Sequence, residues 1–321
     1  MTFDLNPETI LGSVERATGL PLTGLISPLP SYINRVYELR STEGEKIIVK
    51  FYRPGRWNPT AINDEHTFLG ELDKEELSVV PPRVLMNGTT LDTVNGTPFA
   101  VFPKKAGRQL EITTREDWIR LGTLVARMHT VGSKHSANDR LIMHPHHSTS
   151  ADSDYLCQNV LPVQYRESYR SLVRELIDLS SPVFEQSERI RLHGDLHRGN
   201  MLDRMQEGLL LIDFDDMVMG PPVQDLWLLL PDRAVNSGTE IELFLEGYEQ
   251  FRDFNRRTLA CIEPLRAMRM IYFLAWCSRQ IGDYQFRRNF PDWGTDAFWR
   301  KEINDLREQM GFVRESSGPA S

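Results

Sequence analysis

The sequence changes character at residues 103–107, a Pro-Lys-Lys-Ala-Gly segment. Before it, short apolar runs alternate with turn dipeptides such as Asn87-Gly88, a pattern typical of antiparallel strands. After it, apolar residues recur every three or four positions, as in amphipathic helices. A chain of 321 residues also exceeds what one hydrophobic core usually supports. We therefore predict an α+β, bilobal fold, with a small antiparallel β-rich lobe at residues 1–102, a hinge at 103–107 and a larger, mainly helical lobe at 108–321.

The first lobe is expected to contain strands and one inserted helix. Asn6 and Pro7 suit the N-cap and the first position of a leading helix. A short turn at residues 41–44 joins two strand-like runs and predicts a β-hairpin. The expected strands are 32–39, 46–52, 83–86, 89–94 and 97–102, and the inserted helix lies near 60–72. In the second lobe, a strand-like stretch at 190–217 interrupts the helices.

Composition excludes several classes of protein. Lys plus Arg number 37 against 45 Asp plus Glu, a net charge of −8 that argues against binding to nucleic acid or to an anionic membrane surface. The longest uncharged apolar run, Met270–Cys277, is far shorter than the roughly 20 residues of a membrane helix. Three cysteines without CxxC spacing indicate neither disulfides nor a zinc site. With no signal peptide and no long heptad pattern, we expect a cytoplasmic monomer.

The most informative segment is His193-Gly-Asp-Leu-His-Arg-Gly-Asn200, which precedes an apolar run and Asp213. Asp195 and Asn200 are five residues apart, as in kinase catalytic loops, and a hairpin would return Asp213 beside Asn200. Phosphoryl transfer needs a carboxylate near the attacking hydroxyl and oxygen ligands for Mg²⁺, which Asn200 and Asp213 can supply. A polar loop and an acidic strand end are the plain structural alternative. Their order and spacing favour an ATP- and Mg²⁺-dependent phosphotransferase.

A kinase also needs a cation on the ATP phosphates, held by a carboxylate from a helix. Ile47-Ile-Val-Lys50 resembles the corresponding strand of protein kinases, so Lys50 is the candidate. The following helix offers Asp64 and Glu65. Glu65 is preferred because Phe68 and the apolar residues after it would pack beneath it.

The usual glycine-rich nucleotide loop is missing from this sequence. The corresponding segment, Leu29–Val36, contains no glycine. Ser31 and nearby backbone N–H groups could still bond phosphate oxygens, although a plain turn is the competing interpretation. Adenine is expected to bond to backbone near Val101, Phe102 and the residues that follow, with ATP between the lobes.

These residues resemble the aminoglycoside phosphotransferase/choline kinase-like branch of the protein-kinase-like superfamily. His193–Asn200 and Ile212–Asp215 match its two catalytic motifs. Flanking segments are similar to the bacterial stress response kinase A (YihE-type) group of Ser/Thr kinases, namely Ser31–Tyr37, Val49–Pro54, Ala100–Pro103, Gly220–Trp227 and Glu263–Arg269. This resemblance implies a cytosolic monomer that phosphorylates protein Ser/Thr and itself in stress response. It also implies that Asp195 accepts the proton, that Asn200 and Asp213 hold magnesium and that Ser31 approaches the ATP.

Other polar residues have more than one interpretation. His193 is expected to brace the catalytic loop, and His197 either contacts the transferring phosphate or is structural. Asp225 could cap a helix, but the resemblance suggests a buried carboxylate that supports the loop backbone. Arg266 and Arg269 share a helix face and are expected to line the acceptor cleft.

Two alternative functions stay open at this stage. The catalytic motifs do not separate a protein kinase from a kinase for aminoglycosides, choline, homoserine or another small hydroxylated metabolite. A non-catalytic ATP-binding scaffold is the second alternative. The presence of Lys50, Asp195, Asn200 and Asp213 together argues against the scaffold.

Overall fold

The computed structural model describes residues 5–31, 33–205, 207–282 and 284–317. The chain divides into two compact units, neither of them continuous in sequence. The first comprises Met1–Thr113, Thr130–Arg140 and His197–Met217, and the second comprises Thr114–His129, Leu141–Leu196 and Val218–Ser321. The mixed architecture, with the main sheet in the N-terminal part and most helices in the C-terminal part, confirms the predicted α+β fold class. The boundaries at 103–107 stay a prediction.

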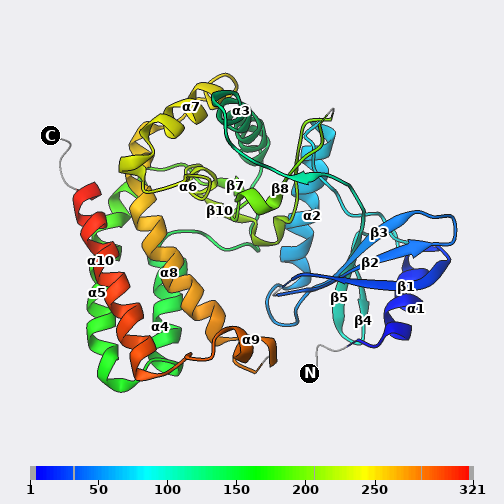
Figure 1. The fold of residues 1–321 in the computed structure, drawn as a ribbon, viewed down its shortest axis with the longest axis horizontal. Helices are drawn as coiled ribbons and strands as arrows, with labels where there is room; N and C mark the ends of the chain where they lie inside the picture. Colours follow the sequence, from blue (N-terminus) through cyan, green and yellow to red (C-terminus); the bar gives the residue numbers. More distant parts are fainter. Residues whose placement is uncertain (1–4, 32, 206, 283, 318–321) are drawn as a thin grey trace. The chain divides into compact units, whose positions relative to one another are not determined.

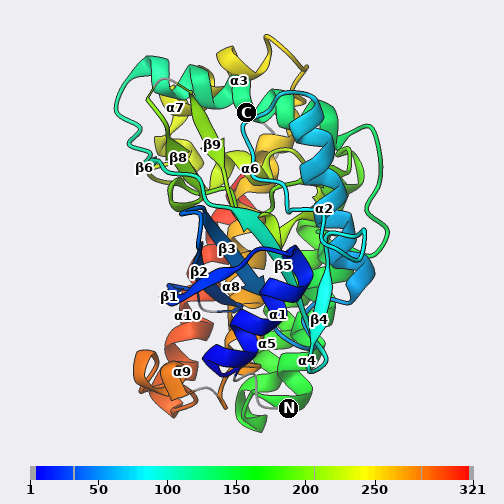
Figure 2. The same cartoon turned by 90° about the vertical axis from the view of Figure 1, so that its right-hand side faces the viewer.

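Within the described residues, the first unit has a five-stranded antiparallel sheet with the order β1-β2-β3-β5-β4 (Figures 1 and 2). The predicted hairpin is present, and Val36 of β2 pairs with Lys50 of β3. The strands are β1 Leu22–Leu29, β2 Arg35–Ser41, β3 Lys46–Phe51, β4 Asp92–Val94 and β5 Thr97–Pro103. The central position of β3 places Lys50 between two hydrogen-bonded neighbours.

The predicted strands differ from the structure in several places, and the strand predicted at 89–94 is confined to Asp92–Val94. Strand β1 was not predicted, because it contains Gly24 and Pro28 and none of its residues is buried; an edge strand tolerates both. The predicted strand at 83–86 is wrong: Arg83 and Leu85 donate single backbone bonds, to Val101 and Thr89, without forming a ladder. Tyr32, the first residue of another predicted strand, lies outside the described residues.

Two helices pack on the strands of the first unit. Helix α1, Pro7–Thr18, begins as predicted, since the Asn6 side chain accepts the N–H of Thr9 at 2.8 Å. Its apolar residues share a buried core with residues of β3 and β5. Helix α2, Pro59–Lys74, presents Phe68 to Phe214 in an edge-to-face contact, 5.8 Å between ring centroids. This contact fixes α2 to the short helix η3, Phe214–Asp216.

A small second sheet of the first unit, in the order β6-β8-β9, contains the predicted return hairpin. Its strands are β6 Arg108–Gln109, β8 Met201–Asp203 and β9 Leu209–Leu211. Met201 pairs with Leu211, and the N–H of Ile212 donates to the carbonyl of Asn200 at 3.0 Å. The two polar segments of the motif are therefore joined by the hairpin expected from their spacing.

The second unit is mainly helical. Helix α10 lies along α5 and α8 in Figure 1, and strands β7, Ile190–Leu192, and β10, Val218–Gly220, form an antiparallel pair. Its helices are α3 Arg115–Gly132, α4 Ser150–Asn159, α5 Val163–Glu185, α6 Gln224–Trp227, α7 Gly238–Tyr248, α8 Ile262–Ser278, α9 Tyr284–Asn289 and α10 Asp296–Ser317. The last residues of α3, from Thr130, belong to the first unit.

Glycines allow α3 and α7 to touch through their backbones. A Cβ atom added to Gly122 of α3 would lie 1.8 Å from the carbonyl oxygen of Phe244, and one added to Gly247 of α7 would lie 1.9 Å from that of Ile119. No L-amino acid with a side chain fits at either place without separating the helices.

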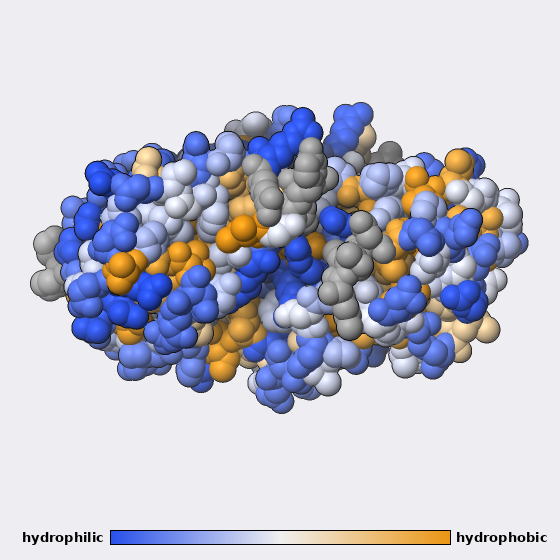
Figure 3. Space-filling view, turned by 90° about the horizontal axis from the view of Figure 1, so that it is seen from below, coloured by the Kyte–Doolittle hydropathy of each residue, from blue (hydrophilic) through white to orange (hydrophobic). Residues whose placement is uncertain are grey.

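The surface is predominantly hydrophilic on the face shown in Figure 3, where hydrophobic side chains form small separate patches. The large exposed apolar residues come from many parts of the chain, among them Leu25, Val84, Val163 and Phe273. In the described part of the chain, no helix has the length and apolar character needed to cross a membrane.

Candidate active site

Lys50 lies at the centre of an ion cluster in the first unit. Its Nζ atom is 3.1 Å from Asp215, 3.4 Å from Asp213 and 3.5 Å from Glu65, and its side chain is 9% exposed. Strand β3 supplies the lysine, α2 supplies Glu65, and the segment after β9 supplies both aspartates. Asp64, the alternative partner, instead accepts the N–H of Asp139 at 3.1 Å.

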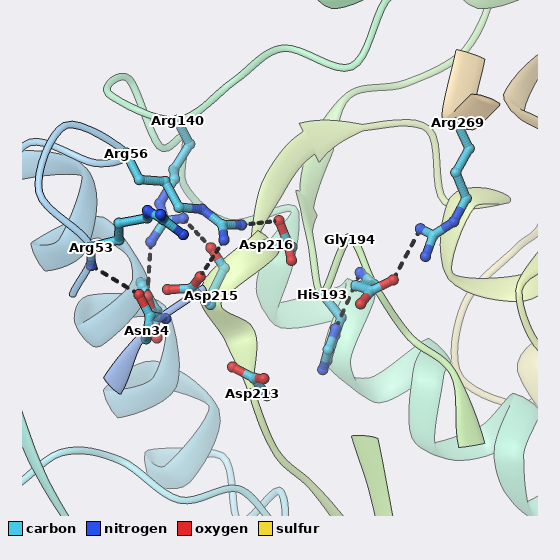
Figure 4. Close-up of polar contacts among 12 residues, drawn as sticks. Asn34, Arg53, Arg56, Arg140, His193, Gly194, Asp213, Asp215, Asp216 and Arg269 are labelled. Atoms are coloured by element: carbon cyan, nitrogen blue, oxygen red, sulfur yellow. Dashed lines mark hydrogen bonds and ion pairs between the residues drawn. The ribbon is translucent and has the colours of Figure 1, made fainter. Parts of the chain in front are cut away.

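Arg140 ties two of these elements together. Its fully buried guanidinium donates to Glu65 at 2.9 Å, to the carbonyl of Ala61 at 2.7 Å and to the carbonyl of Asp215 at 2.7 Å (Figure 4). It also lies over the ring of Trp57, 4.4 Å from the centroid. One arginine thus holds the helix α2 and the aspartate segment in a common position.

The charges in the cluster shift one another's pKa values. Burial raises the pKa of Asp215, but the cations Lys50 and Arg56 outweigh it and lower that pKa to about 2. Burial alone would lower the pKa of Lys50, yet Asp215 and Glu65 hold it well above its ordinary value. Both groups are therefore charged near neutral pH.

Asp213 has the most open position among these carboxylates, with its side chain 58% exposed. Its backbone is left-handed, at φ 61° and ψ 67°, a conformation that Asp and Asn tolerate better than most residues. Asn200 ends the short helix η2, Arg198–Asn200, and the β8–β9 hairpin links it to the start of the Asp213 segment. Carboxylate and amide oxygens are the hard ligands that Mg²⁺ prefers, so this donor set fits that ion together with phosphates.

In the second unit, Asp225 anchors the loop that carries His193, Gly194 and Asp195. Its fully buried carboxylate accepts the N–H groups of His193 at 2.8 Å and Gly194 at 2.9 Å. Gln224 donates to the carbonyl of Gly194 at 2.7 Å. These bonds confirm the expectation that Asp225 supports the loop, and Gly194 accommodates its φ of 85° without strain.

Asp225 is itself held from a second side. His129 of α3 lies 3.1 Å from Asp225 through Nε2 and 3.0 Å from the hydroxyl of Tyr248 through Nδ1. All three side chains are fully buried. Residues of α3 and α7 therefore hold the Asp225 carboxylate in position, and this carboxylate in turn holds the backbone at His193 and Gly194.

The candidate catalytic carboxylate, Asp195, pairs with an arginine of α8. Arg269 Nη1 lies 3.0 Å from Asp195 Oδ1, with side chains 44% and 22% exposed (Figure 4). Arg266, the other arginine expected near the acceptor, donates to the carbonyl of Asp232 at 2.7 Å and stacks on Trp227. Of this pair, Arg269 is therefore the one that contacts Asp195.

The two candidate histidines have local hydrogen-bond partners. Nδ1 of the buried His193 accepts the N–H of Asp195 at 3.4 Å, a long bond within the loop. Nδ1 of His197 accepts the N–H of Gly199 at 3.0 Å and caps the short helix η2. His193 belongs to the second unit and His197 to the first.

The candidate nucleotide contacts at the sheet are less clearly marked. Ser31 lies in the connection between β1 and β2. Val101 is buried in β5, where its carbonyl accepts the N–H of Arg83, and Phe102 packs beside Tyr52. Adenine and phosphate binding at these residues stays a prediction.

Sequence reasoning did not find Arg140 or Arg56. Arg56 lies 3.2 Å from Asp215 and also pairs with Asp216. Neither arginine belongs to a recognisable motif. The available signal was electrostatic: the two buried carboxylates Glu65 and Asp215 carry one negative charge more than Lys50 alone can balance, so a further buried cation is needed.

Comparison with known proteins shows the family of the chain. Residues 25–264 match the phosphotransferase enzyme family. Stress response kinase A of Shigella flexneri is 34% identical, and serine/threonine protein kinase RdoA of Salmonella typhimurium (strain LT2) is 33% identical; each alignment covers 97% of this chain and 94% of the relative. A solved amicoumacin kinase in complex with AMP-PNP, Ca²⁺ and Ami superimposes with a TM-score of 0.70 at 18% identity, over 99% of this chain and 96% of that one.

The structural likeness shows a shared fold, and the curated relatives show the family. These relatives bear the names of kinases and align along nearly the whole chain, as the motifs and flanking segments indicated. The chain is a kinase that belongs to the phosphotransferase enzyme family and, within it, to the family of stress response kinase A.

Proposed function

We propose that this kinase transfers the γ-phosphate of ATP, bound with Mg²⁺, to Ser and Thr hydroxyls of cytoplasmic proteins, its own chain included, during stress response. The observation that carries the proposal is the ion cluster around Lys50, which presents a buried cation beside the exposed carboxylate of Asp213. The Salmonella typhimurium relative named a serine/threonine protein kinase supports the choice of acceptor. The solved kinase with AMP-PNP and Ca²⁺ supports the use of ATP and a divalent cation.

Residues of the first unit take the nucleotide in this proposal. Lys50 binds the phosphates, Glu65 and Asp215 orient the lysine, and Asn200 and Asp213 hold the metal. Bound Mg²⁺ would neutralise charge on the transferring phosphate. Ser31 approaches the phosphates, and the backbone around Val101 and Phe102 takes adenine.

Residues of the second unit take the acceptor. Asp195 aligns the hydroxyl and accepts its proton as the hydroxyl oxygen bonds to the γ-phosphorus and the bond from that phosphorus to the leaving ADP breaks. The backbone N–H groups of His193 and Gly194 donate to the Asp225 carboxylate, so the loop is held without using the side chain of Asp195. His193 braces the loop from within, and His197 either contacts the transferring phosphate or stabilises the turn before Asn200.

The test is incubation with γ-labelled ATP and Mg²⁺, alone and with a generic protein acceptor. We expect acid-stable label on Ser or Thr. Asp195→Asn should fold like the wild type and transfer about 10²- to 10⁴-fold more slowly, the usual contribution of a general base. Near-normal turnover by this variant would remove Asp195 from the proposed role.

The main competitor is a kinase for small hydroxylated molecules, which uses the same catalytic motifs. A panel of amino sugars, choline and homoserine should therefore be run beside the protein acceptors. Phosphate transfer to one of these compounds, without label on protein, would replace the proposed acceptor while leaving the proposed ATP site intact.

A further inference from the structure

The backbone of the loop that carries Asp195 is held by groups other than Arg269. Asp225 and Gln224 already bind the loop through the backbone of His193 and Gly194. Arg269 instead pairs with the carboxylate side chain of Asp195, through Nη1 of a guanidinium that carries five N–H donors in all. The arginine therefore acts at the place where the acceptor hydroxyl must bind.

The exposure of the pair makes it exchangeable. Arg269 is 44% exposed and Asp195 22% exposed, and ion pairs that face water contribute little net stability. Buried pairs such as Arg140 with Glu65 are different, because separating them leaves unpaired charge in the interior. An incoming anion can thus share or replace Asp195 as a partner of Arg269 at small cost.

The same face of α8 continues as an aromatic surface. Phe273 follows Arg269 by four residues, is 44% exposed and stacks on Trp276, with ring centroids 5.9 Å apart. At a rise of about 1.5 Å per residue, these rings lie about 6–10 Å along the helix from the arginine. A face that combines one exposed cation with adjoining rings fits a peptide that carries a negative charge and apolar atoms.

Resting on the proposed function, we propose that Arg269 binds an anionic group on the acceptor and thereby selects protein segments with a carboxylate or phosphate beside the Ser or Thr. A guanidinium binds both anions through charge-assisted hydrogen bonds. An acceptor with a positive group at that position is disfavoured by like charge.

The experiment measures kcat/KM for matched Ser peptides from a degenerate library, with Glu, phosphoserine, Gln or Lys scanned through the flanking positions. At the flanking position that contacts Arg269, the wild type should prefer Glu or phosphoserine over Gln by about tenfold in kcat/KM. This is the effect of one charge-assisted hydrogen bond. In Arg269→Gln this ratio should fall to about twofold or less, and Arg269→Lys should retain part of it. The Glu and phosphoserine arms separate a carboxylate from a priming phosphate as the source of the anion.

Arg314→Gln is the matched control, since Arg314 is also exposed and paired with a carboxylate, Glu175, on a helix of the second unit. It should keep the wild-type ratio. A wild type that labels all peptides equally, or an Arg269→Gln that keeps the preference, would overturn the inference but leave the protein kinase in place. Label on small metabolites and on none of the peptides would overturn both.

Discussion

Lys50 lies nearer to Asp215 than to Glu65, at 3.1 Å against 3.5 Å. The other oxygen of Glu65 is occupied by Arg140 at 2.9 Å. The helix carboxylate is therefore shared between two cations, and the lysine is shared among three carboxylates. In this kinase the position of Lys50 depends on a network rather than on one ion pair.

Arg140 should be among the most sensitive positions for stability. Replacing it with Met leaves Glu65 with one cation fewer in the interior, which should lower the free energy of unfolding by about 3–5 kcal/mol. Arg140→Lys keeps the charge and should lose less, although it cannot make all three hydrogen bonds. Urea unfolding of both variants checks this.

The double variant Arg140→Met with Glu65→Leu isolates the cause. If the loss comes from uncompensated charge, the double variant should be more stable than the sum of the two single changes implies. Additive losses would show that Arg140 contributes through packing on Trp57 instead.

Asp213 should matter for nucleotide binding and little for folding. Asp213→Asn keeps a residue that tolerates the left-handed backbone but removes the charge. If the contact between the Asp213 carboxylate and Mg²⁺ contributes as much binding free energy as a hydrogen bond to a charged group, the affinity for Mg·ATP should fall about 10- to 150-fold. Calorimetry with Mg·ATP measures this, and ATP in EDTA shows how much of the effect needs the metal.

The melting temperature without nucleotide should hardly change in Asp213→Asn, because Lys50 keeps Asp215 and Glu65. Unchanged Mg·ATP affinity would mean that Asp213 is not a metal ligand. Asp213→Ala should add a stability cost of about 1–2 kcal/mol from the left-handed backbone alone.

His66 should make the first unit sensitive to mild acid. Burial, with the charges of Lys50 and Arg140, lowers the pKa of His66 from 6.5 to about 3. Between these values the unfolded chain binds a proton that the folded chain does not, so stability falls as pH drops below 6.5. Between these two pKa values, the loss of unfolding free energy due to His66 approaches about 1.4 kcal/mol for each pH unit.

His66→Gln should flatten the pH dependence of urea unfolding between pH 6.5 and pH 4 relative to the wild type. Thr90→Val is the control, because Thr90 bonds to His66 Nδ1 at 2.7 Å and its loss leaves the titrating ring in place. Thr90→Val should therefore shift stability while keeping a steep profile. If unfolding free energy changed with pH in parallel for His66→Gln and the wild type, the acid sensitivity would not come from His66.

Gly122 should be intolerant of any side chain. Gly122→Ala places Cβ 1.8 Å from the carbonyl oxygen of Phe244, so α3 and α7 must separate, at a cost of about 3 kcal/mol. Gly311→Ala in α10 meets no atom within 4 Å and should gain about 0.5–1 kcal/mol from helix propensity. Thermal unfolding of the two variants should shift in opposite directions.

The elements that the sequence predicted well have short-range signals. The hairpin of β2 and β3 follows from two apolar runs around a four-residue turn, and the return hairpin of β8 and β9 follows from a polar–apolar–polar pattern. Helix α2 was expected at 60–72 and is found at Pro59–Lys74. Each of these signals lies within about 15 residues of chain.

The features that were missed depend on distant contacts. Arg140 meets Glu65 across 75 residues of sequence, and no local pattern marks either the position or the partner. Strand β1 has no buried face to impose an apolar alternation, so its pairing with β2 is what makes it a strand. Such contacts exist only once the fold has brought the segments together.

The buried carboxylate of Asp225 has a consequence for folding during synthesis. It joins the backbone at His193 to His129, while His129 also contacts Tyr248. A nascent chain released only as far as residue 200 contains residues 193–200 and His129, but it lacks Asp225 and Tyr248. We expect phosphate transfer to begin only after α7 has emerged and Tyr248 has docked against His129.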